Sequence, residues 1–155
     1  MRVIGLDLAN KSGICILDNE SGKVLYSDSI NLAKGDSQKR LVKLREIVNQ
    51  AIKTYSPEEM AIEDVFLPAK TSPKTPIALG ELRGIAKLCA AENKIPVFFY
   101  APRQVKMAVT GYGNARKEDV VHFIQAEFNL TVKDDNEADA ISVAFTHILI
   151  QRFQT

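Results

Sequence analysis

The chain has 155 residues, long enough to bury a hydrophobic core, and its length fits a single domain over residues 1–155. Hydrophobic residues make up 46% and charged residues 25%, with no long apolar run and no leader-like N-terminus, so we expect a cytoplasmic protein with no membrane partner. The net charge of +1 neither indicates nor excludes a nucleic-acid partner, so only a local cluster of basic residues can point to one. The two cysteines, Cys15 and Cys89, lie in apolar segments without ligand spacing, which predicts core thiols rather than a disulfide.

Three strand-like stretches open the chain, and strands then alternate with helices. The expected strands cover about residues 2–9, 14–18, 23–32, 60–66 and 96–101. The expected helices cover about residues 37–54, 76–93, 102–110, 116–128 and 137–152. Turn signals separate the first three strands and predict an antiparallel meander. Helical crossovers predict that the later strands are parallel, which gives an α/β fold with a five-stranded mixed sheet flanked by helices.

Three acidic residues lie in stretches that otherwise read as core. Asp7 lies in the first expected strand, Glu63 in the fourth, and Asp139 at the start of the last helix. A carboxylate in an apolar strand is costly unless something pairs with it. Hard cations such as Mg²⁺ prefer carboxylate oxygens, and two of them can activate a water and stabilise the leaving oxygen of a phosphodiester. We therefore interpret the three acids as a metal site of a nuclease, with Asp7 bridging both ions.

Each acid also has an ordinary structural interpretation. Asp7 fits a turn cap, Glu63 fits a buried salt bridge, and Asp139 fits an acid in the first turn of a helix. Each signal is weak alone, and together they favour a site. Asn136, three residues before Asp139, is expected on the same side of the helix.

Basic residues without intervening acids occupy residues 102–117. They are Arg103, Lys106, Arg116 and Lys117, with the flexible bend Gly111-Tyr112-Gly113 between them. If no acidic site lies nearby, a solvated pair of helices is the slightly better interpretation. Beside an acidic site, they are candidates for phosphate contact and for stabilising charge in the transition state.

The stretch 67–76 carries three prolines and two lysines, Lys70 and Lys74, and no acid. Because it follows Glu63 closely, we expect a loop over the site. Phe66, at the mouth of this loop, is positioned to stack on an unpaired base, although core packing is the simpler interpretation. Gly80 and Gly84 lie four residues apart in an expected helix and indicate that another backbone approaches there, such as that of a partner subunit.

Several motifs follow one another in a fixed order along the chain. They are Ile4-Gly5-Leu6-Asp7, Ala61-Ile62-Glu63-Asp64-Val65-Phe66, Leu79-Gly80-Glu81-Leu82-Arg83-Gly84, Tyr100-Ala101-Pro102-Arg103-Gln104-Val105-Lys106, Gly111-Tyr112-Gly113-Asn114-Ala115-Arg116-Lys117, and Ala138-Asp139-Ala140-Ile141 continuing to Thr146-His147. In this order the motifs resemble the RuvC class of Holliday junction resolvases over essentially the full length of the chain.

The resemblance implies a ribonuclease H-like fold and a homodimer that nicks opposing strands of a four-way DNA junction with Mg²⁺, for which Mn²⁺ substitutes. It also implies roles for individual residues. Asp7, Glu63 and Asp139 become metal-binding acids, Lys106 and Lys117 important lysines, Phe66 the aromatic at the junction crossover, and Arg83 a further DNA-binding residue. The helix over residues 76–93 falls at the dimer interface. Nothing in the sequence indicates a branch-migration partner.

The chain departs from the family pattern at Asn136, where an acid or a histidine is usual. Asn is a neutral and weaker oxygen ligand. Three acids and a neutral ligand form the site, or Asp135 or Glu137 takes the vacant role, or the protein is an altered form. The alternative function is a scaffold that binds branched DNA with weak or no cleavage. The compact length resembles a phage-encoded member acting in the host cytoplasm.

A third hypothesis treats residues 5–13 as the first phosphate hairpin of an actin-like ATPase, which shares the same strand meander. Such proteins enclose the nucleotide between two domains, and this chain has room for one. We therefore set the ATPase hypothesis aside.

Overall fold

The computed structural model describes residues 1–32, 36–64 and 72–154. Within these ranges, five strands form one mixed sheet in the order β3-β2-β1-β4-β5. The strands are β1 (Arg2–Asp7), β2 (Lys11–Asp18), β3 (Lys23–Asn31), β4 (Glu59–Glu63) and β5 (Val97–Tyr100). β1, β2 and β3 pair antiparallel, whereas β4 runs parallel to β1 and β5 parallel to β4. The predicted meander and the predicted parallel pairs are both confirmed.

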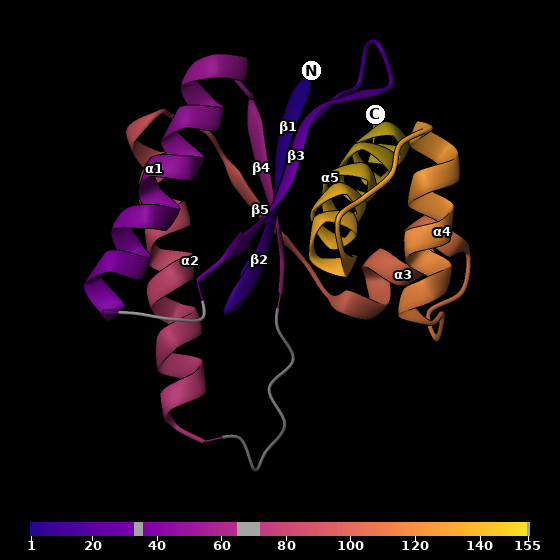
Figure 1. Ribbon diagram of the computed structural model, residues 1–155. Coiled ribbons are helices and arrows are strands. Elements are labelled where there is room, and N and C mark those ends of the chain that lie inside the picture. Colours follow the sequence, from indigo (N-terminus) through magenta and orange to yellow (C-terminus); the bar gives the residue numbers. More distant parts are fainter. Residues whose placement is uncertain (33–35, 65–71, 155) are drawn as a thin grey trace.

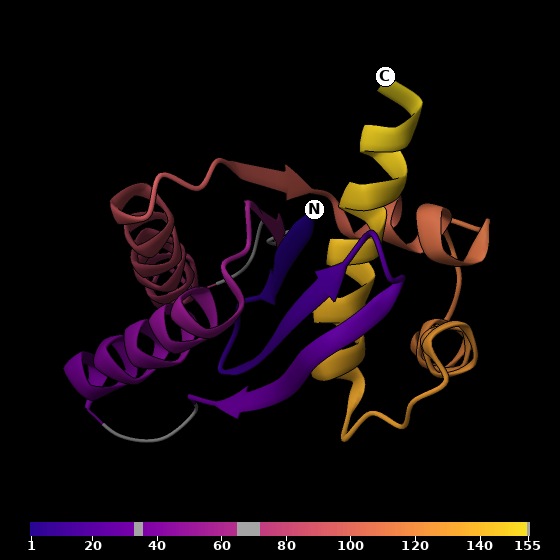
Figure 2. The same cartoon turned by 90° about the horizontal axis from the view of Figure 1, so that it is seen from above.

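The helices form one layer on each face of the sheet. They are α1 (Ser37–Tyr55), α2 (Lys74–Glu92), α3 (Pro102–Thr110), α4 (Lys117–Phe128) and α5 (Asp135–Gln154). α1 and α2 cover one face, and α5 covers the other, with α3 and α4 outside it (Figures 1 and 2). The expected five-stranded α/β fold is therefore correct in its layers as well as its strands.

Several element boundaries differ by one to three residues from the sequence prediction, and two of these differences bear on the site. The fourth strand begins one residue earlier than expected, at Glu59, and ends at Glu63, while residues 65–71 lie outside the described part of the chain. The last helix begins at Asp135 rather than residue 137, because the Asp134 carboxylate accepts a hydrogen bond from the backbone N–H of Glu137 at 3.0 Å. This cap places both Asn136 and Asp139 within the first two turns of α5.

The pleat of the strands decides which residues face α5. Ile4 and Leu6 of β1 pack into the core under α1 and α2, whereas Val3 packs into the core around α5. Because side chains alternate along a strand, Asp7 shares the face of Val3. In β4, Ala61 belongs to the α5 core, so Glu63 also falls on the α5 face. Asp7 and Glu63 therefore leave neighbouring strands on the same side of the sheet.

Two strand glycines let α5 lie directly on the sheet. A Cβ atom built at Gly5 would lie 2.3 Å from the carbonyl oxygen of Ala140, and one built at Gly13 would lie 1.9 Å from that of Asn136. Nothing lies within 4 Å of a Cβ atom built at Gly80 or Gly84. Among the described residues, nothing makes the close approach expected at Gly80 and Gly84. The glycines that permit backbone contact are Gly5 of β1 and Gly13 of β2.

The thiols of Cys15 and Cys89 are free and buried, as the sequence predicts. Among the described helices, none combines the length and apolar character needed to cross a membrane.

Candidate active site

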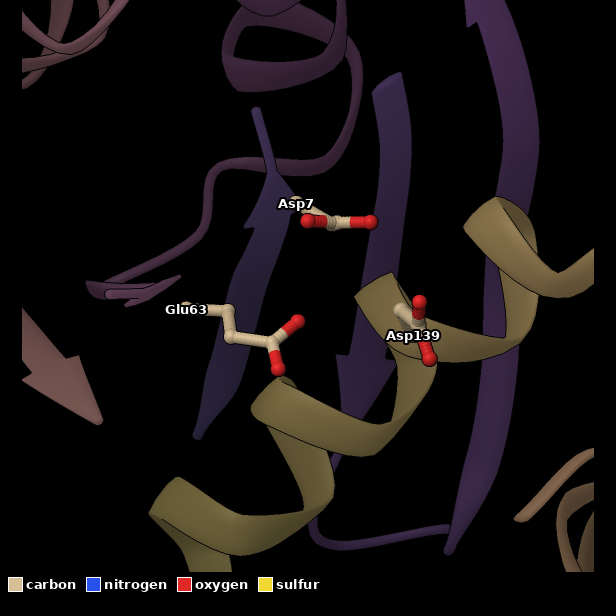
Figure 3. A group of neighbouring side chains, drawn as sticks. All are labelled: Asp7, Glu63 and Asp139. Carbon is tan, nitrogen blue, oxygen red and sulfur yellow. The ribbon is translucent and has the colours of Figure 1, made fainter. Parts of the chain in front are cut away.

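Three carboxylates converge at one end of the sheet. Asp7 ends β1, Glu63 ends β4, and Asp139 lies in the second turn of α5 (Figure 3). One carboxylate oxygen from each residue lies within 4.8 Å of the other two. Asp7 and Glu63 meet because β1 and β4 are parallel neighbours, with Leu6 paired to Ile62 one residue before each acid. The predicted grouping of the three acids is confirmed.

The surroundings of the three acids make their negative charge unfavourable. Burial raises the pKa of Glu63 to about 8 and that of Asp7 to about 7, and neighbouring carboxylates add to both shifts. Burial also raises the pKa of Asp139 to about 6, against the opposing effect of the Lys117 ammonium. Three half-buried carboxylate donors held this close fit a hard divalent cation, which would offset their mutual repulsion.

The ordinary structural roles of these acids are filled by other groups. The turn after β1 is closed by Ser12, whose hydroxyl donates to the Ala9 carbonyl at 2.7 Å and accepts from the Ala9 N–H at 3.0 Å. Asp134, rather than Asp139, caps α5. Within the described ranges, no basic side chain forms an ion pair with Glu63. The structure therefore does not support a turn cap, a buried salt bridge or a helix cap as the role of these three acids.

A cavity of about 670 Å³ opens over the three carboxylates. Three lysines from separate elements line it: Lys74 from α2, Lys106 from α3 and Lys117 from α4. Positive charge thus surrounds the acids at the wall of one pocket, an arrangement suited to a negatively charged ligand.

The Lys117 ammonium lies 2.9 Å from the carboxylate of Asp135, in the first turn of α5. This hydrogen bond raises the pKa of Lys117 and lowers that of Asp135. Both side chains are partly exposed, so the energy of the pair is modest. Asp135 therefore stays ionised as a partner of Lys117 and lies outside the group of three metal-competent acids.

Glu137 points to the other side of α5. It is 5% exposed, and its two carboxylate oxygens accept from the Ser27 hydroxyl at 2.7 Å and from the Lys133 N–H at 2.6 Å. The hypothesis that Glu137 takes the role missing at Asn136 is wrong, because one of its oxygens ties α5 to Ser27 of β3 and the other binds the backbone just before α5. Asn136 itself lines the cavity. The pocket therefore combines the three clustered acids with a neutral amide at position 136.

A family model described as crossover junction endodeoxyribonuclease RuvC matches residues 3–147. The chain belongs to the RuvC family. The RuvC protein of Thermotoga petrophila is 34% identical over 158 residues, which cover 98% of this chain and 94% of the relative. That of Caldanaerobacter subterraneus subsp. tengcongensis is 37% identical over 157 residues, covering 95% and 92%. Both relatives are bacterial proteins, so the expected phage origin gains no support.

Solved structures of RuvC share the fold. The Thermus thermophilus RuvC structure has a TM-score of 0.86 at 24% identity, covering 100% of this chain and 98% of the other. The structure of T. thermophilus RuvC in complex with Holliday junction substrate has a TM-score of 0.89 at 25% identity, covering 100% and 97%. The expected ribonuclease H-like architecture is thereby confirmed as that of RuvC.

The other residues that we expected to contact DNA either lie outside the cavity lining or fall outside the described part of the chain. Arg103 and Arg116 are exposed and lie outside the lining of the cavity. The Arg83 guanidinium lies 2.9 Å from the Asp64 carboxylate and 4.3 Å from the centre of the Phe99 ring, contacts that favour a structural role. Phe66 and Lys70 lie outside the described residues.

The structure adds polar lining residues that the sequence did not single out. Asn10, Arg40 and Asp64 all line the cavity. Arg40 lies outside the apolar stripe of α1, so the sequence predicts a surface residue and gives no sign of a role at the site. Its place beside the acids depends on how α1 packs against the turn after β1, which no local pattern predicts.

Proposed function

We propose that this RuvC-family chain is a metal-dependent endodeoxyribonuclease that resolves four-way DNA junctions by paired nicks, acting as a single domain in the cytoplasm. The observation that carries the proposal is the meeting of Asp7, Glu63 and Asp139 within 4.8 Å under a lysine-lined cavity. The likeness to T. thermophilus RuvC in complex with Holliday junction substrate supports a branched DNA substrate.

Asp7, Glu63 and Asp139 would hold the divalent cation, for which we propose Mg²⁺, with Mn²⁺ as a substitute. When bound, such a cation supplies Lewis-acid activation and charge neutralisation at a phosphodiester. The protein itself contributes a desolvated set of carboxylates, which keeps the charges of the site strongly interacting. Lys106 and Lys117 line the same cavity and would stabilise negative charge that develops on the reacting phosphate. Asn136 would orient ligands through its amide.

Positively charged side chains at and around the cavity would hold the DNA that lies outside it. Lys74 lines the cavity, and the exposed Arg103 and Arg116 lie on α3 and just before α4. Stacking of Phe66 on an unpaired base and contacts from Lys70 and Arg83 remain predictions. Because phosphate contacts are independent of sequence, these residues would set affinity rather than cleavage preference.

We further propose a homodimer formed through α2. Ile77 and Leu88 of this helix are 62% and 51% exposed, and Gly80 and Gly84 lie between them with open space above. These four residues recur at helical spacing and form an apolar stripe with a flat centre, suited to close helix packing. A two-fold dimer matches a two-fold junction and would place two sites for paired nicks. Leu88→Glu is expected to shift the protein towards monomer in sedimentation equilibrium.

Cleavage of a labelled four-way junction tests the enzymatic proposal. In Mg²⁺ or Mn²⁺ the protein should release symmetric nicked duplexes, with linear duplex of the same sequence as the control. Asp7→Asn should abolish cleavage and leave junction binding largely intact. Loss of binding on this change would refute the role of Asp7 as a metal ligand.

The second candidate is a scaffold that binds branched DNA without appreciable cleavage. It is favoured by Asn136, which puts a neutral amide in the cavity where the family usually has an acid or a histidine. The same assay separates the two candidates, because a scaffold would bind the junction and leave it intact in both Mg²⁺ and Mn²⁺.

A further inference from the structure

We infer that Arg40 is a phosphate-binding residue of this site, which contacts the backbone of the DNA strand in the cavity from the α1 side of the sheet. The inference rests on the proposed function, since it names a further contact to the same substrate. It is carried by the position of Arg40 at the cavity, by the way its guanidinium is held, and by a positive charge that no acid among the described residues neutralises.

Arg40 belongs to the helix layer of α1 and α2, which also supplies Lys74, and not to the layer that carries Lys106 and Lys117. Lys106 and Lys117 come from α3 and α4, on the α5 side of the sheet, whereas Arg40 comes from α1 on the opposite side (Figure 2). Arg40 nevertheless lines the same cavity as Asp7 and Glu63, as does Asn10 in the turn after β1. A strand lying over the acids would thus have positive charge on both sides.

The guanidinium of Arg40 is held in place by a neutral partner. Its Nη2 donates to Asn10 Oδ1 at 3.1 Å. Asn10 is itself fixed, because its carbonyl oxygen accepts from the Leu32 N–H at 2.6 Å and Ser12 closes the same turn onto Ala9. An amide partner orients the guanidinium without neutralising it, so the full positive charge is retained.

The Nε donor of Arg40 has no partner among the described residues. Its Nε is buried, and among the side chains of the described residues it is the one buried nitrogen or oxygen without a hydrogen-bond partner. Lys117 and Arg83 each pair with an acid, whereas no acid within the described ranges forms an ion pair with Arg40. A buried unpaired donor is unfavourable and rare in native proteins. The guanidinium fork matches a phosphate group, which would accept from its Nη donors and balance its charge.

The salt dependence of junction binding tests this contact. Variants are compared in an Asp7→Asn background with Mg²⁺, so that binding to a labelled four-way junction is measured without turnover. Each phosphate contact contributes about 0.9 to the slope of log K against log salt concentration. Arg40→Gln should make this slope shallower by about 0.9, whereas Arg40→Lys should preserve it. Arg45→Gln is the matched control, because Arg45 lies on the same helix, is exposed and is absent from the cavity lining.

Single-turnover cleavage in the otherwise unchanged protein provides the second measurement. Arg40→Gln should slow cleavage at least about tenfold, the effect of losing about 1.4 kcal/mol of transition-state stabilisation. Arg40→Lys should be slowed less, because a lysine keeps the charge and loses the fork. Arg45→Gln should cut at the unchanged rate.

The possible outcomes separate this inference from the proposed function. If the unchanged protein cuts the junction while Arg40→Gln behaves like Arg45→Gln, the inference is wrong and the proposed function stands. If Arg40→Gln lowers the melting temperature and leaves the salt slope unchanged, Arg40 only ties α1 to the turn, and the inference is wrong. If the unchanged protein binds the junction without cutting it, the proposed cleavage is wrong. The salt slope of junction binding then still decides whether Arg40 contacts a phosphate. Absence of junction binding would overturn both.

Discussion

Gly13 of β2 lies so close beneath Asn136 of α5 that a Cβ atom at Gly13 would sit 1.9 Å from the Asn136 carbonyl oxygen. Gly13 is also the residue paired with Asp7 across the β1–β2 ladder. The start of α5 is therefore seated directly beside Asp7, and this contact brings Asp139 to the other two acids. Gly13, which has no side chain that could bind a metal, thus helps to set the geometry of the proposed metal site.

Gly13→Ala should destabilise the protein and damage the site. No side chain can be accommodated without moving α5 from the sheet, and such overpacking costs about 1–3 kcal/mol or more. Urea unfolding should show this loss, together with weaker Mg²⁺ binding. Lys39→Ala is the control, since Lys39 is exposed on α1 and lies outside the cavity lining. Equal stability of Gly13→Ala and the unchanged protein would contradict the close contact.

The metal-free protein should become less stable as pH rises from about 4 to about 8. Burial raises the folded-state pKa values of Asp139, Asp7 and Glu63 to about 6, 7 and 8, above their ordinary values. The folded state then binds more protons than the unfolded state across this window, so the free energy of unfolding falls with rising pH. Thermal melts in a chelator should show the decline, and Mg²⁺ should reverse it at pH 8 far more than at pH 5. Asp7→Asn should flatten the curve; an unchanged curve would argue against the buried acid cluster.

Asn136→Asp should strengthen metal binding. It adds a carboxylate to the cavity that holds the three clustered acids, and the number of charged ligands tunes cation affinity. We expect the Mg²⁺ concentration for half-maximal cleavage to fall by about tenfold, which corresponds to about 1.4 kcal/mol. Asn114→Asp, at an exposed position outside the cavity lining, is the matched control. A variant that binds Mg²⁺ no better than this control would show that residue 136 does not reach the ion.

Glu137→Ala should lower stability without changing the metal affinity. It removes the carboxylate that accepts from Ser27 and from the Lys133 N–H, and hydrogen bonds to charged groups contribute about 1.5–3 kcal/mol each. Asp139→Asn should show the reverse pattern, with Mg²⁺ binding lost and metal-free stability raised at pH 8. Calorimetric Mg²⁺ titration beside urea unfolding distinguishes the two. Weaker Mg²⁺ binding by Glu137→Ala would return this residue to the site.

The sequence by itself determined the order of strands and helices and the choice of the three acids. Alternating apolar residues predict the strands, and the same alternation puts Asp7 on the face of Val3 and Glu63 on the face of Ala61. The acids stand out because charge in an apolar strand needs a compensating partner. These are local properties, written in a few consecutive residues.

Only the tertiary structure decided which neighbours of the acids take part in the site. Asp135, Asn136 and Glu137 are consecutive, yet Asp135 pairs with Lys117, Asn136 lines the cavity, and Glu137 binds Ser27. Arg40 and Arg83 are both helix arginines, yet Arg40 lines the cavity with its Nε unpaired among the described residues, while Arg83 is held by Asp64. Their roles follow from which distant residues pack against them. Adjacent helix positions point about 100° apart, so the seating of α5 and α1 on the sheet selects one direction for each side chain.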